Sequence, residues 1–434
     1  MARAGRHHLT RSRRSPGGRA LAGVAVLLCL LAAGAAIAAG LRLTGGGDGG
    51  AGGTPMAAER IDPQTSGLAI RRVPDGSQGP LAAAQESLVA AVISDLDDFW
   101  ATTVPAVAGQ DFTPLRGGVT AVDSAAPTGS TACVSRPDRI GGNAYYCPDD
   151  DGIVYDSSAL VPVLLYRYGA PGLVGAFAHE FGHAVQARIG PTPEERNARP
   201  ARYPSLLIEA QGDCDAGAFL RWVVAGKARH IHLDAGAMLA AAGPLLDFAD
   251  PVTVPPTDSA AHGLSLDRLT SLLLGYRQGA AACHAMTVDS LHPTLGAIRL
   301  SPGGAAALVT PRYAGTPEVL AAAGRSIAAF TGSPVTATAA PADLASAVPY
   351  GQFAEATALA LAVGRQSYGS AAGAACFAGA WAASVFGDAP PGSLGSWPGD
   401  ADEGLDLVRT RAGASFADAA GYADGFHQGV AACR

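Results

Sequence analysis

The pentapeptide His-Glu-Phe-Gly-His at residues 179–183 constrains this chain more than any other feature. An α-helix turns about 100° per residue, so its two histidines would lie one turn apart on nearly the same face. Two imidazoles in this arrangement can ligate one Zn²⁺, and Glu180 beside them can act on a metal-activated water. Apolar residues recur at helical spacing from 171 to 188, which predicts a helix there. The alternative is a surface helix with two unrelated histidines.

A second helix is predicted over residues 206–224, with Ser205 as its N-cap. Glu209 and Asp213 are four residues apart and therefore share one face of this helix. A catalytic zinc site needs three protein ligands and one open position, and Glu209 would complete the set begun by the two histidines. Asp213 is then placed to accept an imidazole N–H and fix the tautomer of that ligand. Two alternatives stay open: a solvated helix face, or Asp213 or Asp215 as the third ligand.

These two segments carry a family resemblance. His-Glu-Phe-Gly-His-Ala-Val-Gln (179–186) and Glu-Ala-Gln-Gly-Asp-Cys-Asp-Ala-Gly (209–217) resemble the paired core motifs of the neutral zinc metallopeptidase family. Shorter stretches of this sequence also match motifs of that family, and the resemblance covers roughly residues 85–285. The resemblance implies an HExxH, gluzincin-like peptidase in which His179, His183 and Glu209 bind zinc and Glu180 is the catalytic base. It says little about the substrate beyond its being a polypeptide.

A residue that stabilises the developing oxyanion is also expected in such a site. His262 is the first candidate because its His-Gly dipeptide matches another motif of the same family, and His230 and His232 follow. For each of the three, an ordinary surface or core histidine is the more frequent case.

The N-terminus predicts export. Residues 1–19 hold six arginines and no acidic residue, and an uncharged stretch of 22 residues, 20–41, follows. As a helix this stretch is about 33 Å long, enough to span a bilayer. We therefore expect a cytoplasmic basic tail (1–19), a transmembrane signal-anchor (20–41) and an extracellular remainder. A cleaved signal peptide ending near Ala36-Ile37-Ala38 is the alternative, which would make the protein secreted.

Residues 42–80 show no sustained hydrophobic periodicity, and the first of them are rich in glycine. We therefore expect a flexible linker there. Seven of the 30 basic residues precede position 43, which leaves residues 43–434 with 23 basic and 37 acidic residues and a net charge of −14. This charge argues against a nucleic-acid partner. The expected partners are a polypeptide substrate and, through the N-terminal helix, the membrane.

Besides Cys29, which lies in the apolar stretch, the chain has six cysteines, an even number that suits an oxidising compartment. Their spacing suggests the pairs Cys133–Cys147, Cys214–Cys283 and Cys376–Cys433. Free buried thiols, or Cys214 as a metal ligand, are the alternatives. Cys214 follows Asp213 directly and so points about 100° away from it, which argues against ligation.

A similarity between two segments of the chain supports the last two pairs. Gly-Tyr-Arg-Gln-Gly-Ala-Ala-Ala-Cys (275–283) resembles Gly-Phe-His-Gln-Gly-Val-Ala-Ala-Cys (425–433). The sequence around His179 resembles the sequence around Glu355, where Leu359 occupies the position of the second histidine. We therefore expect a zinc metallopeptidase domain over 81–300 and a helical domain over 301–434 that is a degenerate, metal-free repeat of the first. Chance similarity in Ala- and Gly-rich sequence is the alternative.

The expected fold class is α+β, with a helix-dominated, zincin-like domain that includes a small β-hairpin. Helices are predicted over residues 81–100 and 158–168, and the hairpin over 143–146 and 153–156. An edge strand of this hairpin could pair with an extended substrate. Two functions remain open: a membrane-anchored, extracytoplasmic zinc endopeptidase, or an exported binding or scaffold protein with a structural zinc site and no catalysis.

Overall fold

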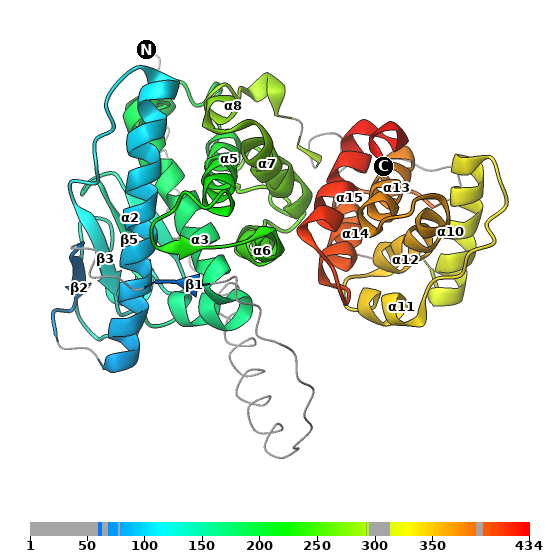
Figure 1. Cartoon of the computed structure of the whole chain (residues 1–434), viewed down its shortest axis with the longest axis horizontal. Coiled ribbons are helices and arrows are strands. Elements are labelled where there is room, and N and C mark those ends of the chain that lie inside the picture. The colour runs from blue at the N-terminus through cyan, green and yellow to red at the C-terminus, as the bar shows by residue number, and fades with distance from the viewer. Residues whose placement is uncertain (1–59, 63–67, 77–78, 292, 295–312, 388–393) are drawn as a thin grey trace, which may run out of the picture. The chain divides into compact units, whose positions relative to one another are not determined.

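The computed structural model describes residues 60–62, 68–76, 79–291, 293–294, 313–387 and 394–434, which all fall within one compact unit, Ala57–Arg434. Figure 1 shows the helices and strands of this unit. The predicted basic tail, the predicted signal-anchor and much of the predicted linker lie outside the described residues.

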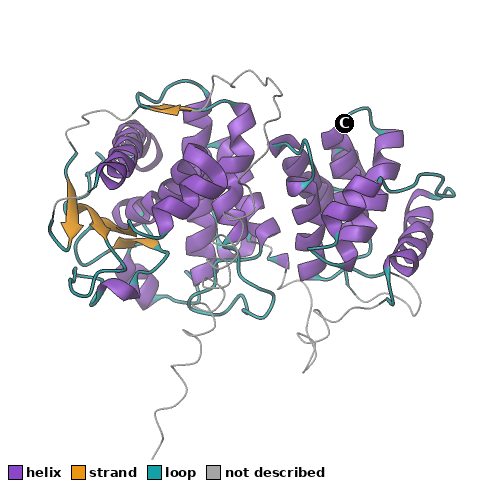
Figure 2. Cartoon of the chain, turned by 90° about the horizontal axis from the view of Figure 1, so that it is seen from below, coloured by secondary structure: helices purple, strands orange, loops and turns teal. Residues whose placement is uncertain are grey.

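Helices dominate the N-terminal part, up to residue 294, and the strands are short (Figure 2). The strands are β1 (Arg60–Ile61), β2 (Ile70–Val73), β3 (Gly118–Val122), β4 (Ala144–Cys147), β5 (Gly152–Asp156) and β6 (Ile231–His232). The helices are α2 (Pro80–Ala108), α3 (Leu160–Ile189), α4 (Pro193–Ala198), α5 (Ser205–Val224), α6 (Met238–Asp247), α7 (Ser265–Gln278) and α8 (Ala280–His284). This confirms the predicted helix-dominated α+β class.

Four strands form one sheet in the order β2-β3-β5-β4. The first three are parallel, and β4 runs antiparallel to β5, with Tyr146 opposite Ile153. The hairpin lies within one residue of its predicted bounds, and β4 is an edge strand. A separate antiparallel pair joins β1 to β6.

The linker prediction was wrong for residues 70–73. They form β2, which pairs with β3 and is tied to α2 by an ion pair between Arg72 and Glu86, with a shortest N–O distance of 2.7 Å. A strand of four residues is too short to give a readable alternation in the sequence, which is why the pattern failed there.

Two other boundaries differ from the predictions. The helix expected to begin at residue 158 begins at Leu160, because the Asp156 carboxylate accepts hydrogen bonds from the backbone N–H of Ser158 and Ala159 at 2.9 and 3.1 Å. It then continues through a kink at Gly169 (φ 68°) into the motif helix, so the two predicted helices form one bent α3.

The N-cap of α5 is Pro204 rather than Ser205. Proline has the extended geometry that the capping position needs (φ −65°, ψ 156°), and Ser205 becomes the first helical residue.

Helix α3 is the one helix among the described residues that is long and apolar enough to cross a membrane by length and composition. Half of its most apolar window is buried inside the protein. Its side chains Leu173, Val174, Phe177 and Phe181 are fully buried in the main hydrophobic core. The apolar character of α3 therefore follows from its central position, and it is a different segment from the predicted signal-anchor.

The described C-terminal part is helical. Its helices are α10 (Thr316–Thr331), α11 (Pro341–Ala347), α12 (Gln352–Ser367), α13 (Ala371–Ser384), α14 (Pro398–Thr410) and α15 (Phe416–Gln428). They gather into one bundle in Figure 1. In its core Phe353 of α12 stacks on Trp381 of α13, with ring centroids 5.2 Å apart.

The three disulfides among the described residues are the three predicted pairs, Cys133–Cys147, Cys214–Cys283 and Cys376–Cys433. The last two tie α5 to α8 and α13 to the end of the chain. Because Cys214 is bonded to Cys283, the alternative of Cys214 as a metal ligand is wrong.

Two helix pairs, α5–α7 and α13–α15, are built alike. A Cβ added to Gly217 would lie 2.0 Å from the carbonyl oxygen of Leu272, and one added to Gly379 would lie 2.0 Å from that of Tyr422. The same steric limit applies at Gly275 and Gly425, where the nearest atoms are the carbonyl oxygens of the cysteines at 214 and 376. Each pair thus combines reciprocal glycine contacts with a disulfide at matching positions, as an internal duplication predicts.

Candidate metal centre

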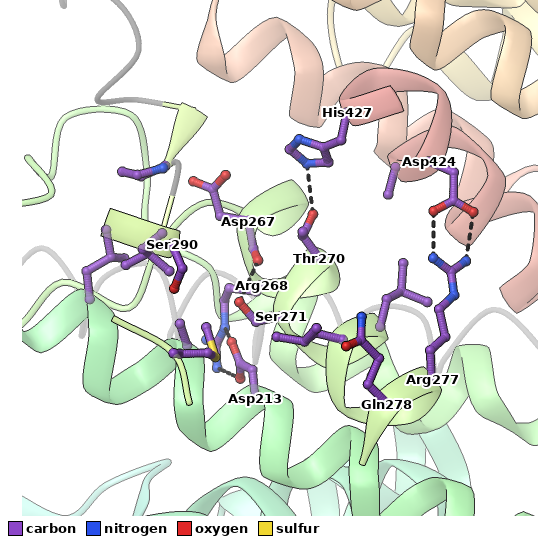
Figure 3. A pocket seen from close by; sticks show the side chains of 18 of the residues that line it. Asp213, Asp267, Arg268, Thr270, Ser271, Arg277, Gln278, Ser290, Asp424 and His427 are labelled. Atoms are coloured by element: carbon purple, nitrogen blue, oxygen red, sulfur yellow. Dashed lines mark hydrogen bonds and ion pairs between the residues drawn. The ribbon is translucent and has the colours of Figure 1, made fainter. Parts of the chain in front are cut away.

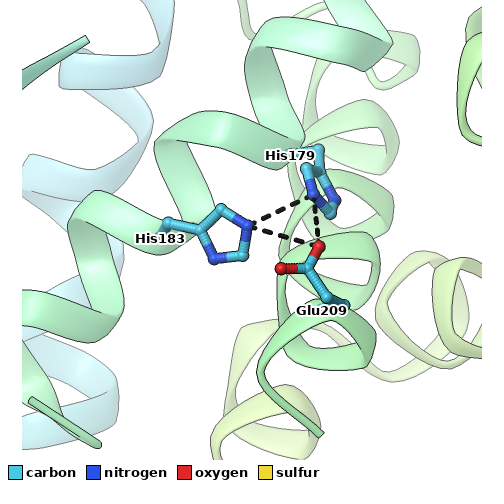
Figure 4. Close-up of side chains that lie close together, drawn as sticks. All are labelled: His179, His183 and Glu209. Atoms are coloured by element: carbon cyan, nitrogen blue, oxygen red, sulfur yellow. Dashed lines mark hydrogen bonds and ion pairs between the residues drawn. The ribbon is translucent and has the colours of Figure 1, made fainter. Parts of the chain in front are cut away.

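Helices α3 and α5 cross at two glycines. A Cβ on Gly182 would lie 3.1 Å from the Cα of Gly212, and a Cβ on Gly212 would lie 3.1 Å from the His179 ring. A side chain at Gly182 would require the backbone of α5 to move by a few tenths of an ångström, and one at Gly212 would require the histidine rings to move by a similar amount. This close crossing brings both imidazoles of α3 against Glu209 of α5 (Figure 4).

The three predicted ligands converge. The Nε2 atoms of His179 and His183 are 3.2 Å apart, and Glu209 Oε2 lies 3.2 Å from the first and 3.6 Å from the second. A tetrahedral zinc ion with ligands at about 2.0–2.1 Å requires ligand atoms about 3.3 Å apart. The observed separations match this requirement. Among the described residues this is the one group of three or more His, Cys, Asp or Glu side chains close enough to hold a metal ion.

The outer nitrogen of each histidine is held by a neighbouring side chain. Asp213 Oδ1 lies 2.8 Å from His179 Nδ1, as the sequence predicts. His183 Nδ1 lies 3.1 Å from Gln186 Oε1, and the Gln186 amide donates to the carbonyl oxygen of Ile208 at 2.8 Å. That second bond fixes the amide orientation, so Nδ1 of His183 must be the donor. Both Nε2 lone pairs are therefore left free to bind a metal.

Arg268 of α7 supports this arrangement from behind. Its Nε and Nη2 donate to the two carboxylate oxygens of Asp213 at 2.9 and 2.8 Å, and both side chains are almost fully buried. Burial raises the pKa of Asp213, but Arg268 and His179 outweigh it, so the pKa is lowered and the carboxylate stays ionised. Sequence reasoning missed the roles of Arg268 and Gln186, although Gln186 is the last residue of the quoted motif 179–186.

Electrostatics at the site favour metal binding. Burial lowers the pKa of His179, but Asp213 and Glu209 raise it by more, and the pKa stands at about 10. The metal-free imidazole is therefore protonated, and a metal ion that binds Nε2 displaces that proton. The carboxylate at Nδ1 then makes the imidazole a stronger ligand. Burial also raises the pKa of Glu180, and the two histidines offset only part of that increase. A carboxylate with a raised pKa suits a general base.

The other predicted histidines divide into two groups. His262 lines the same cavity as Ala210 and Asp213 of α5, and its charge interacts with Glu209 and Glu180. Its Nδ1 is 3.4 Å from Asp250, and this interaction raises the pKa of His262 more than burial lowers it. His230 and His232 lie at β6, where His232 contacts Asp62 at 3.1 Å, and they do not join the site.

Asp215, an alternative third ligand, is fully buried and pairs with His284 Nε2 at 3.2 Å instead. Asp213 is held between His179 and Arg268, so Glu209 is the carboxylate that meets both histidines.

One cation near the site was not predicted. Arg196 of α4 has a buried Nε with no hydrogen-bond partner among the described residues. Its charge interacts with Glu209 and with Tyr146 of the edge strand β4. A buried guanidinium donor without a partner is costly unless a ligand satisfies it. No sequence pattern marks Arg196, because its significance depends on the fold of the loop between α3 and α5.

Two histidines and a glutamate that converge in this way, with a second glutamate next to the first histidine, match the ligand set of zinc metallopeptidases. A family model described as putative neutral zinc metallopeptidase matches residues 11–286, and the chain belongs to this family. Comparison with curated proteins gave no match, and comparison with solved structures gave none either.

Proposed function

We propose that this protein is a zinc-dependent endopeptidase, with His179, His183 and Glu209 as zinc ligands and Glu180 as general base. The observation that carries the proposal is the spacing of the three ligand atoms, 3.2 to 3.6 Å, beside a glutamate whose pKa is raised. A purely structural zinc site would gain nothing from such a base, which argues against the scaffold alternative.

The residues act in sequence on a bound peptide. When bound, the zinc ion supplies Lewis-acid activation of the scissile carbonyl and of a water. Glu180 takes the proton of that water on its carboxylate and delivers it to the leaving amide nitrogen. Protonated His262 donates a hydrogen bond to the carbonyl oxygen as negative charge develops there. The edge strand β4 pairs with the extended substrate backbone in a zincin-like manner, and Arg196 binds a substrate carbonyl.

The first test is metal dependence. Removing the metal from the full-length protein with a chelator is expected to abolish hydrolysis of a peptide library, and one equivalent of Zn²⁺ is expected to restore it. Metal analysis of the purified protein should give one zinc per chain. If the protein binds no zinc, or cleaves peptides equally well without it, the proposal is wrong. Zinc at one per chain without any peptide cleavage would favour the scaffold alternative.

The role of His262 predicts a pH effect. His262 must be protonated to donate, so kcat/KM should fall as pH rises through its pKa, which Asp250 raises above the usual 6.5. Asp250→Asn removes the raising charge, so the alkaline limb of the pH–kcat/KM profile should move to lower pH. Glu209 and Arg268 also act on His262, with opposite signs, and both stay in place. An unmoved limb, or one equally moved in Asp258→Asn, would remove His262 from the mechanism.

We also propose that the enzyme is exported and membrane-anchored. Three disulfides in the described residues suit an oxidising compartment. The uncharged residues 20–41, behind an arginine-rich tail, suit a signal-anchor with the peptidase part outside.

A further inference from the structure

A cavity of about 420 Å³ lies beside the metal centre, between α5, α7, residues 286–291 and α15 (Figure 3). Its volume falls within the range of about 300–1,000 Å³ that is usual for ligand pockets. None of the zinc ligands lines it, so the cavity is a separate compartment that adjoins the site.

The cavity begins on the flank of the helix that presents Glu209. Three residues of α5 line it, Leu206, Ala210 and Asp213. Viewed along the axis of α5, with 100° of rotation per residue, these three residues lie on the same side of Glu209, rotated from it by about 60°, 100° and 40°. Gly212, where an added Cβ would lie 3.1 to 3.3 Å from the two histidine rings, lies about 60° to the other side. The metal centre and the cavity therefore flank the same glutamate.

The two regions meet at Asp213, which lines the cavity and whose Oδ1 lies 2.8 Å from Nδ1 of the ligand His179. His262 also lines the cavity, and its charge interacts with both Glu209 and Glu180. A peptide whose scissile carbonyl reaches His262 would thus have a neighbouring side chain at the mouth of the cavity. This continuity with the metal centre favours a side chain of the substrate as the occupant of the cavity.

The cavity favours apolar groups because its two arginines are already paired, and the third acidic residue that lines it, Asp267, accepts hydrogen bonds from Thr294 at 3.0 to 3.2 Å. Arg268 is bound to Asp213, and Arg277 donates to both oxygens of Asp424 at 2.6 and 2.7 Å. A charged side chain entering here would lose water without gaining a free partner from these pairs. The remaining wall is largely aliphatic and includes Leu274, Met286, Leu291 and Ala423.

The C-terminal part supplies the wall opposite α5. Ala423, Asp424, His427 and Gln428 of α15 line the cavity. Besides the pair between Arg277 and Asp424, Thr270 of α7 contacts His427 at 3.0 Å. In the second helix pair, Ala371 and Ala375 occupy the places that Glu209 and Asp213 hold in the first. A part of the chain without the metal ligands therefore still contributes to the region around the metal.

We propose that this cavity is the specificity pocket for an apolar substrate side chain next to the scissile bond, and that α15 of the C-terminal part forms its outer wall. The proposal rests on the peptidase function proposed above. The substrates are then polypeptides with a bulky aliphatic or aromatic residue at one fixed position beside the cleaved bond.

Two filling substitutions test the pocket from its two sides. The test variants are Met286→Trp and Gln428→Trp, which place an indole in the cavity. The matched controls are Val288→Trp and Val430→Trp. These two valines are 40% and 45% exposed and do not line the cavity. For peptides that differ only at the position beside the cleaved bond, the two filled variants should lose the preference for Leu or Phe over Gly by tenfold or more. The two controls should keep it. Equal preference in all four variants would overturn the proposal.

Binding separates this proposal from the peptidase function. Calorimetry on the zinc-loaded Glu180→Gln protein would measure binding of blocked leucine and aspartate amides. The leucine compound should bind at least tenfold more tightly, and Met286→Trp should remove that difference. If binding behaves so but the wild-type protein cleaves nothing, the pocket stands and the peptidase function fails. If the wild-type protein cleaves peptides but the two compounds bind alike, only the pocket fails.

Discussion

Replacing Glu180 by glutamine is expected to lower kcat/KM for peptide hydrolysis by about 10²- to 10⁴-fold, the contribution of a general base. Glutamine keeps the size of the side chain but cannot accept the proton of the attacking water. The three zinc ligands are untouched, and their spacing is set by the crossing of α3 and α5 at Gly182 and Gly212. Zinc content should therefore stay near one per chain, and the thermal midpoint should change little.

The matched control is Glu194→Gln, which changes an exposed glutamate on the neighbouring α4 without touching the site. It should leave both zinc content and hydrolysis unchanged. Loss of zinc in Glu180→Gln would instead assign this residue to metal binding, and undiminished hydrolysis would exclude it as the base. A side-by-side measurement of kcat and of zinc by mass spectrometry distinguishes these results.

The local part of the site could be predicted from the sequence. Residues at i and i+4 of a helix share a face whatever the rest of the fold does, so the histidine pair and the Glu209–Asp213 pair could be assigned directly. The hairpin could also be predicted, because its two strands flank a turn of a few residues. The disulfide pairs followed from repeated spacing along the chain.

What depends on long-range packing could not be predicted. Arg268 is 55 residues from Asp213 and meets it only because α7 packs on α5. The strand β2 was hidden because its order comes from pairing with β3, not from its own pattern. Arg196 gains its importance from burial without a partner, which no sequence motif records. The cavity beside Glu209 likewise combines helices that are more than 200 residues apart.

Among the proposed substitutions, replacing Arg268 by alanine should lower the free energy of unfolding the most. The change leaves Asp213 fully buried with its guanidinium partner removed, and breaking a buried ion pair in this way typically costs about 3–5 kcal/mol. Asp213 also orients His179 at 2.8 Å, so zinc affinity should fall about 10- to 100-fold, as for the loss of other outer partners of metal ligands. Urea unfolding and competition with a zinc chelator measure the two effects.

Arg277→Ala is the matched control, because it removes an arginine from the same helix α7. Its pair with Asp424 is partly exposed, and such pairs are worth only about 0–1 kcal/mol. Arg277 does not contact Asp213, so zinc affinity should be unchanged. If the two variants lost the same stability and the same zinc affinity, Arg268 would not act on the metal through Asp213. A large difference in both measurements would show that α7 supports the zinc site through Arg268. Arg268 can reach Asp213 because α7 packs closely on α5, at a contact that requires glycine at positions 217 and 275.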